Sequence, residues 1–333
     1  MSMKFAILSD VHGNSPALRM VLEDAAKRGI DRYIIAGDYC LSGAWPDACI
    51  RMLKELSGAC IIRGNEERYL ENLIGKDQSA WTDGQMQISY WNYRNIRKEN
   101  LDFVLSLPHT AEFEADGVKI HVAHSSEEFL GPYEFGVFGP AILAEKYVEP
   151  ENTSSGESSA EGQSDVKKTT NITPEKLRTD IRETLDHDPV FQQKLATLED
   201  GVYIFGHSHV QWSYQAKNRN ILLINPGSCG LPLDGIGGSI PYSIFTIQEN
   251  GTAEAEEIRL PFDKAAYVEE LKKTTQYTEA RVWTEVIIRE LLTAREQMTF
   301  FLQFVNEYAE SIGDTKRPFC VETWEQAYEA WRH

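Results

Sequence analysis

Phe5-Ala6-Ile7-Leu8-Ser9-Asp10-Val11-His12-Gly13 is an apolar run that ends in a carboxylate, an imidazole and a glycine. Such a run is typical of a buried strand, and Pro16 to Arg28 follows it with the apolar spacing of a helix. Tyr33 to Ala36 and Cys60 to Ile62 repeat the strand pattern, with another helix predicted between them over Pro46 to Leu56. This alternation of strands and helices predicts a mainly parallel, buried sheet of the α/β class.

Further strands and a long helical stretch follow this first unit. A helical pattern runs from Gln85 to Leu107, and Asp116-Gly117 predicts a hairpin turn between Ala111 to Ala115 and Val118 to Val122. In the second half, strands alternate with glycine-rich turns, and we expect them to form a second, more antiparallel sheet packed on the first. These predicted strands are Val202 to Phe205, Trp212 to Ala216, Ile221 to Ile224, Tyr242 to Ile247 and Glu254 to Ile258.

The segment 126–200 interrupts this plan, and we predict that it is an inserted cap or arm. Its stretch from Glu149 to Asp165 is acidic, contains no Lys or Arg and is rich in Ser, which is typical of a solvated linker. We therefore expect a flexible linker at about 149–170. Helical patterns lie on either side, around Ala141 to Tyr147 and from Pro174 to Leu198.

The remaining chain divides into a core and a helical extension. We assign residues 1–125 and 201–261 to the core, and residues 262–333 to a C-terminal extension in which apolar residues recur at helical spacing. One aromatic stripe has the spacing i, i+4 and i+7 of a helix face that packs on the body or on a second copy of the chain: Trp324, Tyr328 and Trp331.

Composition restricts the function. A net charge of −18 disfavours a long nucleic-acid partner, because such binding depends on clustered Lys and Arg, but it leaves a small phosphorylated substrate open. No apolar stretch approaches the roughly 20 residues of a membrane-spanning helix, so we expect no membrane partner. Five cysteines, odd in number and without a C-x-x-C pair, favour a reducing cytoplasm: Cys40, Cys49, Cys60, Cys229 and Cys320.

Seven side chains that can bind metals lie at the ends of predicted strands. In parallel sheets, bound molecules and ions lie beyond the carboxyl ends of the strands. The seven are Asp10, His12, Asp38, Asn65, His124, His207 and His209. Oxygen and imidazole ligands without a thiolate suit Mn, Fe, Ni, Co or Zn, and seven are too many for one tetrahedral ion. Two metals that share a carboxylate is therefore the natural interpretation.

Taken singly, most of these residues have simpler explanations. Asp38 would serve as a turn or helix cap, and a lone His124 would be a histidine of the core. Gly206-His207-Ser208-His209 is more specific, because two imidazoles one residue apart project the same way and suit one ligand for each of two neighbouring metals. The joint occurrence of these residues at strand ends is what favours a metal site.

With these motifs the chain resembles the calcineurin-like metallophosphoesterases, specifically their compact prokaryotic branch. The matching stretches are Ser9-Asp10-Val11-His12-Gly13-Asn14, Gly37-Asp38, Arg63-Gly64-Asn65-Glu66, His124, Gly206-His207-Ser208-His209 and Asn225-Pro226-Gly227-Ser228. The similarity covers roughly Lys4 to Ser125 and Val202 to Pro261. It implies a four-layer α/β/β/α sandwich, in which two mixed sheets are flanked by helices and a two-metal site lies at the strand ends.

The resemblance also implies a division of the ligands between two divalent metals, with manganese as the first expectation. One metal would be bound by Asp10, His12, Asp38 and His209. The other would be bound by Asp38, Asn65, His124 and His207, so that Asp38 bridges them. Hydrolysis of a phosphoester by a metal-bridging hydroxide that attacks phosphorus in line is the implied reaction.

The same resemblance gives further residues a place around the site. Asn65 would ligate a metal and also donate to a phosphate oxygen. Asn14, Asn225 and Ser228 are expected near the substrate, and the turn from Asn225 to Ser228 is expected to be mainly architectural.

One departure from the family concerns the leaving group. Many members have Gly-Asn-His-Glu, whose His protonates the leaving group, whereas Glu66 stands at that place here. Glu66 is a tentative acid if burial raises its pKa; His12 or a cap residue is an alternative donor, and capping of the following helix is an equally simple role for Glu66. A leaving group that needs little protonation would favour phosphodiesters and activated esters.

A second departure is the sequence Pro232-Leu233-Asp234, where related chains often carry a basic residue. Two other functions stay open. A nuclease of the same family is disfavoured by the acidic composition, and a non-catalytic scaffold of the same fold is disfavoured by the complete ligand set. A homo-oligomer formed through the C-terminal helices is a further expectation.

Overall fold

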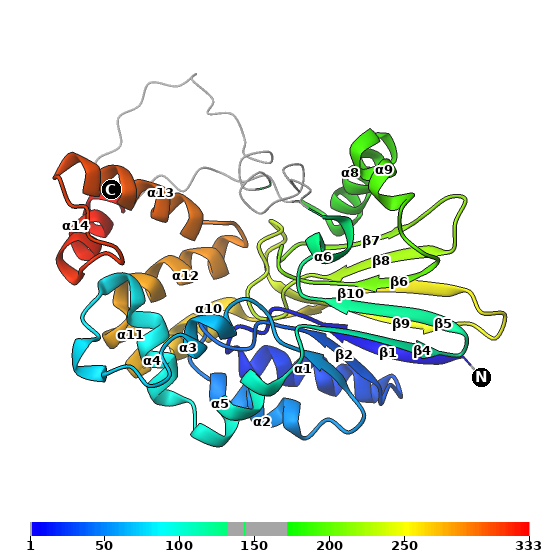
Figure 1. Cartoon of the computed structure of the whole chain (residues 1–333), viewed down its shortest axis with the longest axis horizontal. Coiled ribbons are helices and arrows are strands. Elements are labelled where there is room, and N and C mark those ends of the chain that lie inside the picture. Colours follow the sequence, from blue (N-terminus) through cyan, green and yellow to red (C-terminus); the bar gives the residue numbers. More distant parts are fainter. Residues whose placement is uncertain (1, 132–142, 144–171, 333) are drawn as a thin grey trace.

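Two five-stranded sheets lie face to face in the computed structural model, which describes residues 2–131, 143 and 172–332 (Figure 1). The first sheet has the order β10-β9-β1-β2-β3. Its strands are β1 (Met3–Leu8), β2 (Tyr33–Ala36), β3 (Cys60–Ile62), β9 (Ser239–Ile247) and β10 (Ala253–Pro261). β1, β2 and β3 are parallel, as the sequence predicts, because helices connect them.

The second sheet has the order β4-β5-β6-β8-β7 and is also mixed. Its strands are β4 (Thr110–Ala115), β5 (Val118–Ala123), β6 (Gly201–Ile204), β7 (Gln211–Gln215) and β8 (Ile221–Pro226). The predicted hairpin of β4 and β5 is confirmed, and β5, β6 and β8 run parallel to one another.

Two strands lie in a different sheet from the one predicted. We expected Tyr242 to Ile247 and Glu254 to Ile258 in the second sheet, but as β9 and β10 they extend the first, with Phe5 paired to Phe245 across β1 and β9. The reason is that β1 has a free side opposite β2. An antiparallel hairpin on that side leaves β1 in the middle of the sheet, where its backbone groups pair on both sides.

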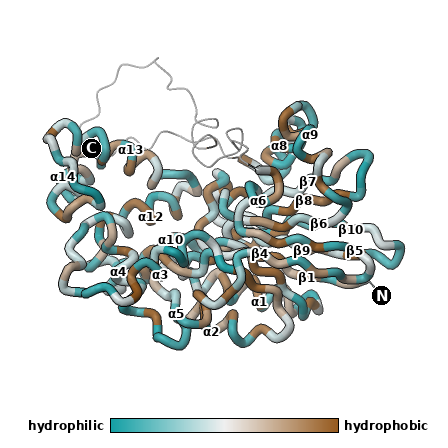
Figure 2. The backbone as a smooth tube through the Cα atoms, viewed as in Figure 1, coloured by the Kyte–Doolittle hydropathy of each residue, from teal (hydrophilic) through white to brown (hydrophobic). Residues whose placement is uncertain are grey.

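Apolar side chains from both sheets fill the space between them. Phe5, Ile7 and Phe245 of the first sheet pack with Ile120 and Ile204 of the second, and each is buried. Figure 2 shows the hydrophobic residues along the stacked strands and hydrophilic residues over many of the outer loops. This interior layer fixes the two sheets against each other, and hence the strand ends that carry the predicted ligands.

Helices cover the outer face of the first sheet. They include α1 (Ser15–Lys27), α2 (Pro46–Lys54), α4 (Gln87–Asn95) and α5 (Lys98–Ser106). α1 starts with Pro16 at its first turn, buries Leu18 and Val21, and is capped by Asn14, whose side chain accepts a hydrogen bond from Ala17 N at 3.1 Å.

The helical pattern over Gln85 to Leu107 is not one helix. It contains the end of the 3₁₀ turn η2 (Gly84–Met86) and the helices α4 and α5, between which Ile96 and Arg97 are extended. Asp47 stabilises this break, because its carboxylate accepts from the backbone N of Arg97 at 3.0 Å and from its guanidinium. Periodicity alone could not show it, since apolar residues recur on both sides.

Helices α6 (Glu127–Leu130), α8 (Pro174–His187) and α9 (Pro189–Leu195) belong to the predicted insertion. They pack on the outer face of the second sheet, where Leu185 and Phe191 meet Tyr214 and Trp212, and the inserted cap or arm stays a prediction. They therefore supply the fourth layer of the sandwich. The predicted linker at 149–170 and the helix around 141–147 lie outside the described residues, apart from the buried Leu143.

The C-terminal extension is helical, as predicted. It comprises α10 (Lys264–Leu271), α11 (Thr275–Glu279), α12 (Arg281–Thr293), α13 (Met298–Ser311) and α14 (Val321–Trp331). Trp324 and Tyr328 of the aromatic stripe pack within the chain against Phe301 and Val286. Among the described residues, no helix combines the length and the apolar character that crossing a membrane requires.

Candidate metal centre

The seven predicted ligands come together where loops of both sheets meet. The loops after β1 and β2 are joined by hydrogen bonds from Asp10 N to Gly37 O and from His12 N to Asp38 O, both at 3.0 Å. The second sheet joins them through His207 N, which donates to the carboxylate of Asp10 at 3.1 and 3.2 Å. Strand ends that are far apart in sequence thus form one cluster.

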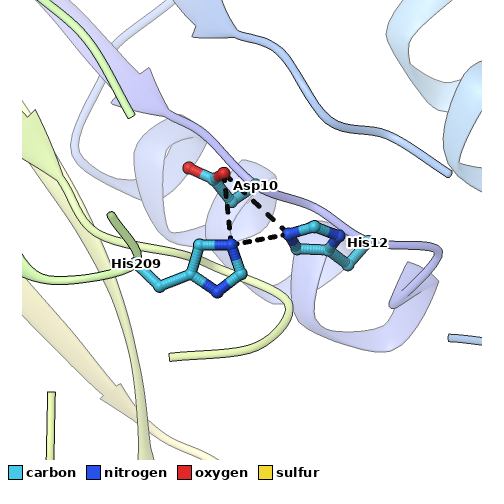
Figure 3. A group of neighbouring side chains, drawn as sticks. All are labelled: Asp10, His12 and His209. Atoms are coloured by element: carbon cyan, nitrogen blue, oxygen red, sulfur yellow. Dashed lines mark hydrogen bonds and ion pairs between the residues drawn. The ribbon is translucent and has the colours of Figure 1, made fainter. Parts of the chain in front are cut away.

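Of the three groups of possible ligand atoms that the described residues form within this cluster, one joins His12 and Asp38 to Glu66, and the other two contain predicted ligands alone. Asp10, His12 and His209 form one and Asp38, His124 and His207 the other, and in each group the atoms lie within 4.8 Å of one another. Figure 3 shows the first group, in which the Asp10 carboxylate faces both imidazole rings. The division matches the one that the family resemblance implies, although the assignment of each residue to a metal stays a prediction.

The backbone of the cluster is strained. Nine described residues other than glycine have a left-handed backbone with positive φ, and five of them are predicted ligands: Asp10, His12, Asp38, His207 and His209. For an L residue this conformation costs roughly 1–2 kcal/mol. Strain of this kind persists where the surrounding structure imposes it and concentrates at functional sites. The backbone conformation of these five residues therefore lowers the stability of the fold while it directs their side chains into the cluster.

Three imidazoles are oriented by hydrogen bonds at Nδ1. His124 donates to Ala36 O at 2.6 Å and His209 to Leu231 O at 2.8 Å, while Nδ1 of His12 lies 2.9 Å from the Glu66 carboxylate. Because carbonyl and carboxylate oxygens only accept, Nδ1 carries the proton in each ring. In the neutral ring Nε2 is then left with its lone pair, which is the arrangement of metal-ligating histidines.

The first group fits a shared cation. Nε2 of His12 and Nε2 of His209 lie 2.9 Å apart, and Asp10 Oδ1 lies 3.4 Å from the latter and 3.9 Å from the former. Since both rings use Nδ1 as a donor elsewhere, two lone pairs and a carboxylate converge on one point. A divalent ion satisfies all three groups at once, and the donor set of oxygen and imidazole suits such an ion.

The second group has a similar convergence. Nε2 of His124 lies 3.1 Å from Asp38 Oδ2 and 2.9 Å from Asn65 Oδ1, and the ring of His207 stands at 70° to that of His124. Asp38 also lies within 4.8 Å of His12 of the first group. The carboxylate of Asp38 is thus in reach of both groups, as a bridging ligand must be.

The cluster is electrostatically coupled. Burial raises the pKa of the Asp10 and Asp38 carboxyls, but neighbouring histidines outweigh it and hold both values below the usual range. Burial lowers the pKa of His12 and of His124, but the charges of Glu66 and Asp38 outweigh it and raise each to about 10. Ionised carboxylates thus attract protons onto the imidazoles, and divalent cations would replace these protons on binding.

Glu66 does not cap the helix that follows it. It precedes α3 (Glu67–Glu71) and makes no capping hydrogen bond with its side chain. Instead its carboxylate turns back to His12 Nδ1, and its backbone N donates to Asp38 Oδ1 at 2.9 Å. Burial raises the pKa of Glu66, partly offset by the charge of His12. Its side chain therefore contacts a predicted ligand and not the end of α3.

Glu67 and Tyr39 contribute contacts that the sequence alone does not reveal. The Glu67 carboxylate is fully buried and accepts hydrogen bonds from Tyr39 N at 2.7 Å and Gly64 N at 2.8 Å. It thereby joins the loops that carry Asp38 and Asn65. Burial and the neighbouring Asp38 raise the pKa of Glu67 to about 7. The pair Glu66-Glu67 after Asn65 is the only sequence feature that points to a buried carboxylate here, but the sequence does not indicate which of the two is fully buried.

Asn14, Asn225 and Ser228, which we expected near the substrate, are buried scaffold residues. Asn14 donates to Gly230 O, Asn225 donates to Gly206 O, and Ser228 Oγ donates to Asp10 O at 2.7 Å. Each is at most 1% exposed. Their side chains connect the loops that carry the predicted ligands. This agrees with a mainly architectural role of the turn from Asn225 to Ser228, and the burial of all three side chains argues against contact with the substrate.

Comparisons with known sequences found a family and a relative. The sequence model of the calcineurin-like phosphoesterase family matches residues 3–211. An uncharacterized protein of Methanocaldococcus jannaschii is 26% identical over 277 residues, which cover 79% of this chain and 89% of that protein.

Solved structures share the fold. A metallophosphoesterase from Sphaerobacter thermophilus aligns with a TM-score of 0.58 and 19% identity, covering 88% of this chain and 99% of that chain. A hypothetical protein from Pyrococcus horikoshii OT3 aligns with a TM-score of 0.53 and 13% identity, covering 89% of this chain and 100% of that one. At these identities the two structures support the architecture alone.

Proposed function

The chain belongs to the calcineurin-like phosphoesterase family, and from that premise we propose that it is a two-metal hydrolase of small phosphodiesters or activated phosphomonoesters, including nucleotides. The observation that supports this most directly is the pair of ligand groups around Asp38. Loss of such ligands would be the mark of a scaffold, whereas here all seven predicted ligands come from loops that meet. A phosphoester hydrolase is the activity that the family implies.

The residues would bind two divalent ions as the family pattern predicts. Asp10, His12 and His209 supply one set of donors, and His124, His207 and Asn65 the other, with Asp38 between them. When bound, such ions neutralise the phosphate oxygens and lower the pKa of water. The loops contribute preorganisation, because Nδ1 bonds of the histidines fix the rings before any substrate arrives.

Charge balance supports a preference for diesters. Asp10, Asp38 and Glu66 place three carboxylates around the two groups, which would offset most of the positive charge of two divalent ions. A phosphodiester carries one negative charge, whereas a monoester carries roughly −1.5 to −2 at pH 7. The extra carboxylate of Glu66, where related enzymes have a histidine, therefore favours the monoanion.

The leaving group leads to the same preference. His12, His124 and His209 already donate through Nδ1, so none of them has a ring proton to give while its Nε2 binds a metal. Phenolate and similar leaving groups depart with little protonation, whereas simple alkoxides need an acid. We therefore expect aryl or nucleotide esters to react faster than alkyl monoesters.

An assay on metal-stripped protein, reloaded with Mn, Ni, Fe, Co, Zn or Mg in turn, tests the proposal. Substrates are an aryl phosphodiester, the matching aryl phosphomonoester and a panel of cyclic nucleotides. We expect turnover with at least one metal, Mn first, and a higher kcat/KM for the diester than for the monoester. Failure to hydrolyse any substrate with any metal would leave the scaffold as the better interpretation.

Location and partners remain proposals. All five cysteines are free. We propose that the protein is located in a reducing cytoplasm, because the cysteines of secreted proteins tend to form disulfides. Assembly of copies through the C-terminal helices is a further proposal, which sedimentation of the purified protein tests. The aromatic stripe of α14 packs within the chain. An interface between two copies would therefore have to use other residues.

A further inference from the structure

The loop 38–45 begins with the predicted ligand Asp38 and folds around a second one, His12. His12 N donates to Asp38 O at 3.0 Å, and Gly43 N donates to His12 O at 2.7 Å. Both backbone groups of His12 are thus bonded to this loop, and two further backbone hydrogen bonds join the loop to Gly13. The place of the His12 ring therefore depends on the conformation of loop 38–45.

The loop and the turn that carries His12 are in close contact. A Cβ added at Gly43 would lie 2.6 Å from His12 O, and a Cβ added at Gly13 would lie 2.4 Å from Gly43 O. His12 itself has a left-handed backbone, with φ 47°. Because no free space separates the two segments, a shift of the loop must also shift the backbone of His12.

Two consecutive residues in the middle of the loop also have a left-handed backbone. Leu41 has φ 56° and Ser42 has φ 53°, and neither is a glycine or a predicted ligand. The other two such residues of the described chain lie where this conformation is common, Asp116 in the hairpin turn between β4 and β5 and Ala294 at the end of α12. Leu41 and Ser42 lie in neither setting, so contacts with the surrounding structure must impose their conformation.

Two buried amide side chains supply these contacts. Asn92 of α4 accepts a hydrogen bond from Leu41 N at its Oδ1, at 3.0 Å, and Gln276 of α11 donates from Nε2 to Ser42 O at 2.6 Å. Both side chains are fully buried. Because a carbonyl oxygen only accepts, the NH₂ end of Gln276 is the one that faces Ser42. The strained pair is thus held at two successive residues.

Gln276 has no other evident reason to be a glutamine. Its bond to Ser42 O is the one hydrogen bond that its side chain makes with the residues that the structure describes, and its Oε1 is buried without a partner among them. A buried unpaired oxygen costs stability, so the amide is poorly explained by stabilisation of α11. Gln276 also lies beyond residues 3–211, which the family model matches.

We propose that Gln276 is a positioning residue of the candidate metal centre. Together with Asn92 it holds loop 38–45 in its strained conformation, and the loop in turn fixes the backbone of His12. The C-terminal extension thereby takes part in placing a metal ligand. This inference rests on the proposed two-metal function, because it concerns how well the ligands of those metals are placed.

Isothermal titration of metal-stripped protein with Mn²⁺ alone tests this role. Gln276→Met keeps the length of the side chain but removes both its donor and its unpaired oxygen. We expect Mn²⁺ affinity to weaken about threefold to thirtyfold, which is typical of residues that act through others. The Tm should change little, because the lost hydrogen bond and the relieved unpaired oxygen offset each other.

Thr323→Val is the matched control in the same C-terminal extension. Thr323 is 4% exposed, and its hydroxyl donates to the Asp314 carboxylate at 2.5 Å and not to loop 38–45. The variant therefore loses a buried donor without releasing the loop. We expect a lower Tm and an unchanged Mn²⁺ affinity, the reverse of the result for Gln276→Met.

Hydrogen exchange of the metal-free protein, followed by mass spectrometry of peptides, gives a second measurement that no metal influences. Amides of residues 38–45 should exchange faster in Gln276→Met than in the wild type, because their exchange follows local opening of the loop. In Thr323→Val they should exchange at the wild-type rate.

Three results would overturn the inference and leave the two-metal function standing. They are wild-type Mn²⁺ affinity in Gln276→Met, wild-type exchange of its loop amides, and equal weakening of Mn²⁺ binding in Thr323→Val. Absence of Mn²⁺ binding by the wild type would instead overturn the two-metal function and this inference with it. If Gln276→Met does not fold by far-UV circular dichroism, Gln276→Asn gives the same comparison, because its amide is one methylene too short to reach Ser42 O.

Discussion

The loops around the candidate metal centre bury carboxylates and imidazoles on strained backbone, whereas helices α12, α13 and α14 bury aromatic and aliphatic side chains in relaxed helices. Asp10 and Asp38 are at most 2% exposed and have positive φ. Trp324 and Phe301 are fully buried, with ring centroids 4.8 Å apart. Burial of apolar rings stabilises the fold, whereas removing charged groups from water and straining the backbone both cost free energy.

The residues that stabilise the fold are therefore largely separate from the residues that we expect to bind metal. Substitutions in the C-terminal helices should change the free energy of unfolding and leave metal binding intact. Substitutions of the predicted ligand side chains and of Glu66 should change metal binding, with small or even favourable effects on unfolding. Gln276 links the two regions, because its side chain donates to Ser42 O in the loop after Asp38.

The largest effect on stability should come from Trp324→Ala. Its ring packs against Phe301 and Trp283, so its removal should lower the free energy of unfolding by about 3–5 kcal/mol. Chemical denaturation followed by fluorescence measures this. The variant Leu292→Ala, whose side chain is 53% exposed on the same helical region, should stay within about 0.5 kcal/mol. Lost metal binding in folded Trp324→Ala protein would break the comparison.

Gly206→Ala should damage the metal loops by steric overlap. A Cβ at Gly206 would lie 1.8 Å from Ser9 Oγ and 2.4 Å from Asp10 Oδ2. We expect a loss of about 1–3 kcal/mol in unfolding free energy, together with weaker metal binding because Asp10 must move. Gly237→Ala is the control, since its added Cβ meets no atom within 4 Å. Equal metal affinity in both variants would contradict the close fit at Asp10.

His207→Gly should stabilise the metal-free protein while it weakens metal binding. His207 has φ 68°, which glycine adopts without strain, so the unfolding free energy should rise by about 0.5–1 kcal/mol. Asp116→Gly relieves a similar conformation, with φ 46°, at an exposed hairpin turn, and it should raise stability without altering metal affinity. A destabilised His207→Gly protein would show that the strain argument is wrong at this site.

Glu66→Gln should have the smallest effect on folding and a clear effect on metal affinity. The change removes the negative charge that orients His12 Nδ1, and loss of such a partner lowers affinity about tenfold to a hundredfold. Unfolding should change little, because Glu66 is partly exposed. If kcat instead loses the high-pH limb of its profile, Glu66 is the proton donor and its positioning role is secondary.

The strand ends and the polar residues that follow them were predictable from the sequence because both depend on local patterns, whereas metal binding by these residues stays a prediction. Apolar runs such as Tyr33 to Ala36 end at a glycine and a polar residue, and the bounds of β2 and β3 agree with the predicted ones. Parallel strands then bring their carboxyl ends to one edge without further information.

The remaining features depend on tertiary contacts that no local pattern records. The apolar patterns of β9 and β10 would suit either sheet. Only the pairing of β9 with β1 shows that both strands belong to the first sheet. The direction of the Glu66 side chain is set by His12, a residue 54 positions away. The packing partner of helices α8 and α9, the outer face of the second sheet, is identifiable only in three dimensions.

Metal stoichiometry tests the central claim most directly. Protein that has been stripped of metal, reloaded with Mn and freed of excess ion should contain two metals per chain by inductively coupled plasma mass spectrometry, while Asp38→Asn should lose both, because it removes the charge between two cations. One metal per wild-type chain, or two metals retained in Asp38→Asn, would contradict a two-metal centre bridged by Asp38.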